Sequence, residues 1–280
     1  MLKYLNIGST KISCWVNTGA FDSRKNNLVF IHGSGGNHSI WSHQYGRLHK
    51  RYNIVAVNLP GHGHSEGNGE RHVQHYREWM KKILPAFDLK DPVLVGHSLG
   101  AAIALDFALR YPLDTAGIVC IGAGMKMPVN AFFLDYLQTN PPEIPAEIID
   151  VICKFSLART NREKLSDPLR KSLALSRVET LYGDLLACNE LDLSQDADKI
   201  NVPALIVCGA EDKMTPPDLS RALAQQIVGA KLAIVEGAGH TVMLEKPSEF
   251  NNGLDQFAES VCPASNPLKK YDTGDMPCLF

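Results

Sequence analysis

Residues 96–100 read G-H-S-L-G, the pattern of a serine nucleophile held on a sharp turn between a strand and a helix. The run at 92–95 is apolar, and residues 101–110 are helix formers that stop at Tyr111-Pro112. Small residues at both ends of the pentapeptide let strand and helix approach closely, which forces Ser98 onto a strained turn with its hydroxyl outward. We therefore predict a catalytic serine at Ser98; the alternative is a glycine-rich turn with only a structural role.

A serine hydroxyl is a poor nucleophile unless a base takes its proton and a third group orients that base. In this architecture the acid and then the histidine follow the serine in the chain. Residues 209–217, G-A-E-D-K-M-T-P-P, follow an apolar run and carry adjacent carboxylates, and residues 237–240, G-A-G-H, follow another and present one histidine. Both segments stand at strand ends, where ligands collect in open α/β sheets.

These motifs together resemble the α/β-hydrolase family, in particular its lidded serine esterase-like branch, over the chain up to about residue 260. H-G-S-G-G at 32–36 resembles the oxyanion loop of that family. N-L-P-G-H-G-H-S at 58–65 resembles its D-L-P-G-x-G-x-S turn, with Asn58 where aspartate is usual. That departure concerns a turn residue and leaves the chemistry unchanged.

The resemblance implies a triad of Ser98 as nucleophile, His240 as base and Asp212 as the group that orients the base. It also implies an oxyanion hole made by the backbone N–H groups of Ser34 and Leu99. Two donors aimed at a developing oxyanion are worth several kcal/mol in such sites. The side chains at 34 and 99 are therefore loosely constrained.

Each of these assignments has a structural alternative. Glu211 or Asp218 could replace Asp212 as the acid, and His240 could be a structural loop histidine. Residues 122–130, where some relatives carry the acid, contain neither Asp nor Glu. Two close-spaced histidine pairs raise the question of a metal site, but no cysteine or H-x-H-x-D pattern accompanies them, so we expect no metal. These histidines are His62, His64, His72 and His75.

Strand-like and helix-like runs alternate along the chain, which is typical of a parallel sheet covered by helices. We expect an α/β-hydrolase fold: a mostly parallel central sheet flanked by helices, with an inserted helical cap. The expected strands are 27–32, 52–58, 92–95, 116–121, 204–208 and 231–236, and residues 1–7 also alternate like a strand. The expected helices are 41–49, 71–87, 101–110, 217–228 and 248–260.

The alternation breaks between residues 125 and 198, where 130–137, 146–157 and 167–186 are expected to be helical. We therefore predict a core of 1–124 and 199–262, a helical cap or lid of 125–198, and a C-terminal extension of 263–280. The cap carries an apolar stripe, from which we expect Phe132 and Phe133 to bind substrate. The alternative is that the stripe only packs the insert itself.

Composition limits the class of protein. The 280 residues suit one large α/β domain, 45% hydrophobic residues can form a sizeable core, and a net charge of −2 argues against nucleic-acid or anionic-membrane partners. No apolar run approaches the roughly 20 residues of a membrane span, and the N-terminus lacks the apolar stretch of a signal peptide. Seven scattered cysteines without a C-x-x-C pair favour a cytoplasmic protein with reduced thiols. The sequence leaves open whether the chain forms a homodimer.

Serine at 98 argues against the haloalkane dehalogenase and epoxide hydrolase branches, whose nucleophile is aspartate. The leading prediction is a carboxylic-ester hydrolase for small to medium, largely apolar esters, working through an acyl-enzyme without a cofactor. The alternatives with the same triad are a C–C bond hydrolase of aromatic ring-cleavage products, a thioesterase or lactonase, and a cofactor-free perhydrolase. The C–C hydrolases usually have proline and an aromatic residue or cysteine where this chain has Gly36 and Thr241. The alternative of another class is a non-catalytic small-molecule receptor.

Overall fold

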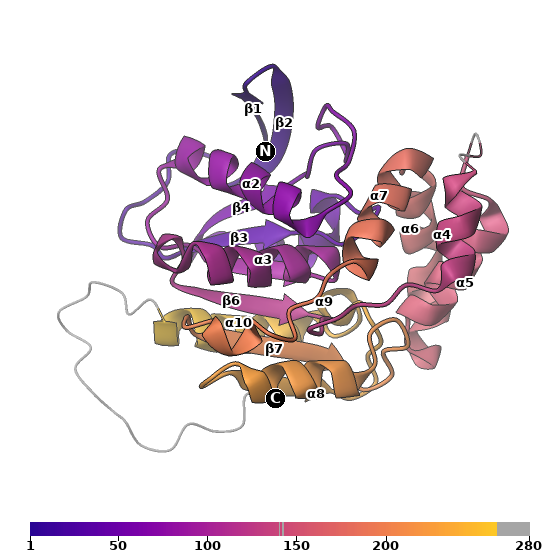
Figure 1. Ribbon diagram of the computed structural model, residues 1–280. Coiled ribbons are helices and arrows are strands. Elements are labelled where there is room, and N and C mark those ends of the chain that lie inside the picture. The colour runs from indigo at the N-terminus through magenta and orange to yellow at the C-terminus, as the bar shows by residue number, and fades with distance from the viewer. Residues whose placement is uncertain (140, 142, 262–280) are drawn as a thin grey trace.

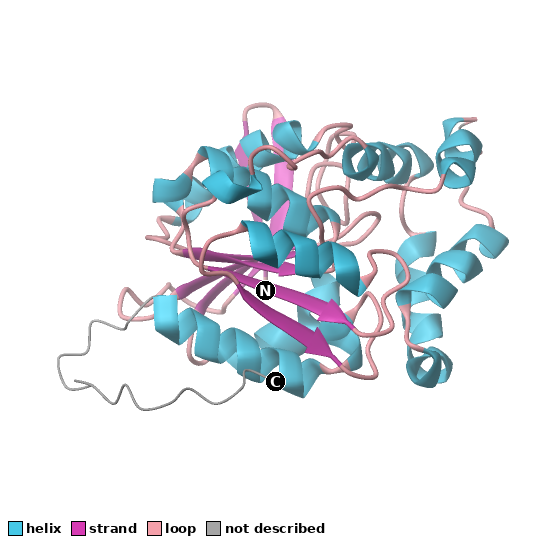
Figure 2. Ribbon diagram, turned by 60° about the horizontal axis from the view of Figure 1, so that its bottom comes forward, coloured by secondary structure: helices cyan, strands magenta, loops and turns pink. Residues whose placement is uncertain are grey.

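A twisted sheet runs through the molecule (Figure 2). It has eight strands in the order β1-β2-β4-β3-β5-β6-β7-β8. The computed structural model describes residues 1–139, 141 and 143–261, so the predicted extension at 263–280 lies outside the described residues. Neighbours from β4 to β8 pair in parallel, whereas β1 with β2 and β2 with β4 pair antiparallel. The strands are β1 Leu2–Ile7, β2 Thr10–Val16, β3 Asn27–Ile31, β4 Asn53–Val57, β5 Val93–His97, β6 Gly117–Ile121, β7 Ala204–Gly209 and β8 Lys231–Val235.

The strands expected from the apolar runs are present, each within two residues of its expected bounds. Strands β3 to β7 are buried along their whole length, as continuous apolar sequences require when helices cover both faces of a parallel sheet. The sequence analysis did not predict β2. Gly8, with a φ of +62°, turns the chain so that β2 returns along β1, and Ile12 and Cys14 point into the core.

Helices cover the sheet on both faces (Figure 2). One hydrophobic cluster joins the sheet to α2, α3 and α8, and a second joins the opposite face to α1 and α10. The helices of the core are α1 Ser42–Leu48, α2 Val73–Ile83, α3 Leu99–Arg110, α8 Pro217–Gln226, α9 Val242–Glu245 and α10 Pro247–Val261. Short 3-10 turns are η1 His38–Trp41, η2 Leu84–Phe87, η3 Pro112–Asp114, η4 Arg159–Asn161 and η5 Ala197–Lys199. No helix in the described part of the chain is long and apolar enough to cross a bilayer.

The segment between β6 and β7 carries four helices, and in its described residues it adds no strand to the sheet. They are α4 Ala131–Gln138, α5 Ala146–Ser156, α6 Arg162–Ala174 and α7 Val178–Asn189, and the segment 131–189 that contains them is called the helical insert below. They gather beyond the carboxyl ends of β6 and β7 (Figure 1). The insert has its own hydrophobic cluster, to which Leu137, Ile149 and Leu181 belong.

The prediction of one helical stretch over 167–186 was wrong in detail. Helix α6 begins at Arg162, contains Pro168 and ends at Ala174, and α7 begins only at Val178. The break has a tertiary cause: Ser176 Oγ donates to the carbonyl of Gly35, and Arg177, which is extended, donates to backbone carbonyls of the core. Contacts with such distant partners leave no mark in the local sequence.

The packing of α3 on the sheet leads to a stability prediction. A Cβ at Gly100 would overlap the main-chain carbonyl of Ile31, whereas a Cβ at the exposed Gly46 in α1 would meet nothing within 4 Å. We expect Gly100→Ala to lower the free energy of unfolding by about 3 kcal/mol, because a backbone neighbour cannot move aside. The matched control Gly46→Ala should raise it by about 0.5–1 kcal/mol. Urea denaturation measures both, and equal stability of the two variants would contradict the packing described.

Candidate active site

Ser98 is the single residue between β5 and α3. Its φ of 52° and ψ of −115° lie in a region that residues other than glycine rarely adopt. Its N–H donates to the carbonyl of Ile121 at 2.8 Å. A Cβ at Gly96 would overlap the carbonyl of Gly100, so strand and helix meet backbone to backbone. The turn is therefore strained and held by its surroundings, as a nucleophile elbow requires.

The structure places the predicted acid and base against each other. Asp212 follows β7, His240 follows β8, and Asp212 Oδ2 lies 2.8 Å from His240 Nδ1. The side chains are 0% and 5% exposed, respectively. The alternative acids lie elsewhere: Glu211 accepts a hydrogen bond from the N–H of Arg159, and the side chain of Asp218 is 98% exposed.

Thr215 holds the Asp212 carboxylate. Asp212 Oδ1 accepts from the N–H groups of Met214 and Thr215, and Oδ2 accepts from Thr215 Oγ1, all at 2.9 Å. Burial alone would raise the pKa of Asp212, but His240 and these hydrogen bonds outweigh burial and lower it. The carboxylate therefore stays ionised and keeps the proton of His240 on Nδ1, so that Nε2 can accept one. Thr215 was not predicted from the sequence, although it lies only three residues after Asp212, in the T-P-P segment at 215–217.

Glu245 fixes the loop that carries His240. Its Oε1 accepts from the N–H of Gly239 at 2.9 Å, and its Oε2 accepts from the N–H of Ala158 in the helical insert at 2.8 Å. The N–H of His240 itself donates to the carbonyl of Ser156 at 2.8 Å. The histidine loop is thus bonded directly to the insert, a link between residues more than 80 positions apart that sequence reasoning missed.

His97, next to Ser98, is buried against His240. Its Nε2 lies 3.0 Å from the carbonyl oxygen of His240, the two ring centroids are 4.7 Å apart, and its Nδ1 has no hydrogen-bond partner among the described residues. Burial, together with the nearby His240, lowers the pKa of His97 to about 3. His97 is therefore neutral and donates from Nε2 to the carbonyl of His240.

The predicted oxyanion donors lie beside Ser98. Leu99 is the first residue of α3, and the loop carrying Ser34 touches the serine, since a Cβ at Gly33 would lie 3.2 Å from Ser98 Cβ. Within the described residues, the N–H groups of Ser34 and Leu99, the Ser98 hydroxyl and His240 Nε2 have no hydrogen-bond partner. These four groups are the ones that acyl transfer would use.

Phe132 and Phe133 both lie on α4. Phe132 is 59% exposed and packs edge-on against Phe133, with the ring centroids 5.7 Å apart. Phe133 also packs on the hydrophobic cluster of the insert, the role weighed above as the alternative. Their part in substrate binding stays a prediction.

The histidines considered as metal ligands have other neighbours. His62 Nε2 lies 2.8 Å from Asp184 Oδ2, and His72 Nδ1 lies 2.9 Å from a carboxylate oxygen of Glu190. Across the residues that the structure describes, no three or more His, Cys, Asp or Glu side chains are grouped so that they could hold a metal ion.

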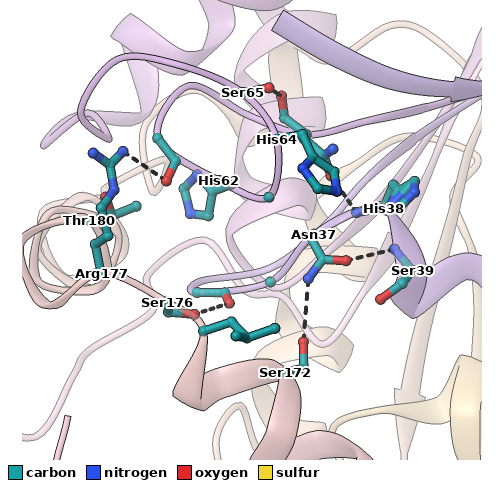
Figure 3. A pocket seen from close by; sticks show the side chains of 16 residues that line it. Asn37, His38, Ser39, His62, His64, Ser65, Ser172, Ser176, Arg177 and Thr180 are labelled. Atoms are coloured by element: carbon teal, nitrogen blue, oxygen red, sulfur yellow. Dashed lines mark hydrogen bonds between the residues drawn. The ribbon is translucent and has the colours of Figure 1, made fainter. Parts of the chain in front are cut away.

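A cavity of about 650 Å³ lies between the insert and the turn at 58–65 (Figure 3). Gly35 and Gly36, from the loop at 32–36, line it on one side, and Ser176 and Arg177 of the insert also line it. None of the three triad residues lines it.

The model of the α/β-hydrolase family matches residues 28–252, and the chain therefore belongs to that family, as the motifs predicted. Its sheet order and its flanking helices confirm the predicted fold.

Relatives of the chain are hydrolases of several kinds. A solved thermophilic esterase is 30% identical, with a TM-score of 0.79, over 93% of this chain and 99% of that one. A putative esterase/lipase of Mycoplasma pneumoniae is 28% identical over 85% of this chain and 91% of its own length. A 2-hydroxy-6-oxononadienedioate/2-hydroxy-6-oxononatrienedioate hydrolase of Paraburkholderia phymatum is 27% identical over 91% of this chain and 94% of its own length. The family and these relatives make the chain a hydrolase.

We expect Ser98→Ala and His240→Ala each to lower kcat for ester hydrolysis by about 10⁴-fold or more, and the double variant to be scarcely worse. The losses do not add because nucleophile and base act as one unit. Steady-state kinetics on an activated ester measure them, with the exposed Ser194→Ala as control. Near wild-type turnover in Ser98→Ala would exclude Ser98 as the nucleophile.

The buried neutral His97 should make the protein sensitive to acid. The unfolded chain binds a proton at this histidine near pH 6.5 but the folded one only near pH 3, so stability falls as pH falls through that window. We expect the stability advantage of the wild type over His97→Gln to shrink by about 2–3 kcal/mol between pH 7 and 4.5. Urea denaturation at the two pH values measures the difference. An advantage that does not change with pH would show that folding leaves the pKa of His97 near its ordinary value of 6.5.

Proposed function

We propose that this hydrolase cleaves carboxylic esters of small to medium apolar acyl and alkyl groups through an acyl-enzyme. The observation that carries the proposal is the Asp212–His240 pair, joined at 2.8 Å, next to a strained Ser98 whose hydroxyl no described residue binds. A serine on a strained turn, with a histidine–aspartate pair available as base and backbone N–H donors beside it, suits attack on a carbonyl carbon.

The reaction proceeds in two halves. Ser98 Oγ attacks the ester carbonyl, its proton passes to His240 Nε2, and the N–H groups of Ser34 and Leu99 stabilise the oxyanion. When the tetrahedral intermediate collapses, His240 returns the proton to the departing alcohol and the acyl group stays on Ser98. Water, deprotonated by His240, then releases the acid and restores the serine. Only groups of this chain and water take part, so the reaction needs no cofactor.

The helical insert acts in this proposal as a cap over the reacting centre. Two bonds support it: Ala158 reaches Glu245, and Ser156 reaches the N–H of His240, so the insert lies directly on the histidine loop. A cap encloses the acyl group and limits water, and so it can set substrate preference without changing the chemical step. The partner expected is a small ester rather than a nucleic acid or a membrane.

A cytoplasmic location is part of the proposal, and the burial of the cysteines agrees with it. Burial raises the pKa of the Cys14 and Cys188 thiols to about 12, which keeps them protonated and unreactive. All five described cysteines are buried and unpaired, which suits a reducing compartment. They are Cys14, Cys120, Cys153, Cys188 and Cys208.

Hydrolysis of a C–C bond is the second candidate, favoured by the likeness to the Paraburkholderia phymatum enzyme. Gly36 and Thr241 argue against it, because C–C hydrolases of this family usually have proline at the first position and an aromatic residue or cysteine at the second. A panel of p-nitrophenyl esters of rising chain length, a thioester, a lactone and a ring-cleavage dienoate decides between them. We expect the highest kcat/KM on an ester, with a burst of one p-nitrophenol per Ser98. Turnover of the dienoate alone would favour the second candidate, and binding without turnover would indicate a receptor.

The position of Phe132 on the insert leads to a prediction about chain length. We expect Phe132→Ala to change the ratio of kcat/KM for octanoyl over acetyl esters by about three- to tenfold, while acetyl turnover stays within about tenfold. The matched control is Leu113→Ala, since Leu113 is a 92% exposed apolar side chain outside the insert. An unchanged ratio would mean that Phe132 has no part in binding the acyl chain.

A further inference from the structure

Asp184 is a carboxylate of the helical insert that lies completely buried against the core. It is 0% exposed, and three donors from three separate core segments converge on it. Its Oδ2 lies 2.8 Å from both the N–H of Gly35 and His62 Nε2, and its Oδ1 accepts from the hydroxyl of Tyr76 at 2.5 Å. So complete a set of partners is what allows a carboxylate to remain charged in the interior.

His62 supplies the opposite charge. Its Nδ1 lies 3.0 Å from the carbonyl oxygen of Pro60 and its Nε2 lies 2.8 Å from Asp184, so both ring nitrogens face acceptors and both carry hydrogen. Burial alone would lower the pKa of His62, but the Asp184 carboxylate outweighs burial and raises it. The two side chains, 2% and 0% exposed, therefore form a buried ion pair between core and insert.

The same carboxylate holds the loop that carries the predicted oxyanion donor. Gly35 directly follows Ser34, and the insert binds Gly35 at both ends: Asp184 accepts from its N–H, and Ser176 Oγ donates to its carbonyl. Figure 3 shows His62 and Ser176 at the two sides of this loop. Gly35 has a φ of +62°, and a Cβ there would crowd Leu181 and Ser176 of the insert at 3.1 Å. The insert therefore holds the peptide bond between Ser34 and Gly35 in a fixed orientation.

We propose that Asp184, charged and paired with His62, is a positioning residue that aims the Ser34 N–H at the oxyanion. The inference rests on the proposed acyl transfer at Ser98. It gives the helical insert a part in the chemical step besides enclosing substrate, because the insert determines the orientation of one oxyanion donor. An ion pair that only fastened the insert to the core would change stability or KM and leave the oxyanion donor in place.

The test compares two carboxylates that each join the insert region to a basic partner. Asp184→Asn keeps the shape but removes the charge next to Gly35. The control Asp192→Asn removes an ion pair with Lys126, at 2.9 Å, whose side chains are more than half exposed. We expect Asp184→Asn to lower kcat by about 10- to 100-fold with KM within about threefold, since a misplaced donor weakens the transition state more than the bound substrate. Asp192→Asn should keep kcat within about twofold.

The second measurement is the affinity for a trifluoromethyl ketone, which adds to the serine and places an oxyanion in the hole. Its Ki should rise in Asp184→Asn by the same factor as kcat falls. Either an unchanged kcat, or a fall in kcat with an unchanged Ki, would overturn the proposal.

Ser176→Ala keeps the test decisive if Asp184→Asn does not fold. It removes the clamp at the Gly35 carbonyl and leaves the buried ion pair intact. We expect kcat to fall and Ki to rise together by about threefold or more; wild-type values for both would overturn the proposal. Failure of the proposed function looks different, because the wild type itself would then form no acyl-enzyme and would not bind the ketone.

Discussion

The direct contact of α3 with the backbones of β3 and β5 is the constraint on which the site depends. Gly100 has no room for a side chain because the carbonyl of Ile31 lies where its Cβ would be, and Gly96 faces the carbonyl of Gly100 in the same way. With both ends of the turn pressed together, Ser98 has to take up positive φ and project from the sheet. At the next strand, Gly122 leaves space for the imidazole of His240.

Buried carboxylates connect this rigid frame to the helical insert. Asp212 orients the imidazole, Glu245 joins the histidine loop to Ala158, and Asp184 joins the oxyanion loop to the insert. Each carboxylate accepts several N–H or O–H groups, which is what makes charge tolerable in the interior. The insert is therefore bonded to two of the loops that the proposed chemistry needs, so substitutions in it can alter the reaction as well as the choice of substrate.

Much of the fold and the candidate site follows from the sequence, because the signals are local. A strand, a glycine-bounded serine and a helix within 20 residues predict the turn at Ser98, and the predicted acid and base each stand just after an apolar strand. The continuous apolar runs predicted the parallel strands, since strands buried on both faces have short, continuous apolar sequences. The insert was predicted from the loss of the strand–helix alternation between β6 and β7.

The sequence by itself determined the family, the parallel sheet and the candidate residues Ser98 and His240, whose patterns are complete within short segments. The family resemblance pointed to Asp212, and the tertiary structure shows that Asp212 faces the histidine whereas the adjacent Glu211 turns toward Arg159. The tertiary structure alone decided that His62 is an ion-pair partner, because Asp184 lies 122 residues away. Buried charge is stable only where partners converge in three dimensions, and no local pattern encodes that convergence.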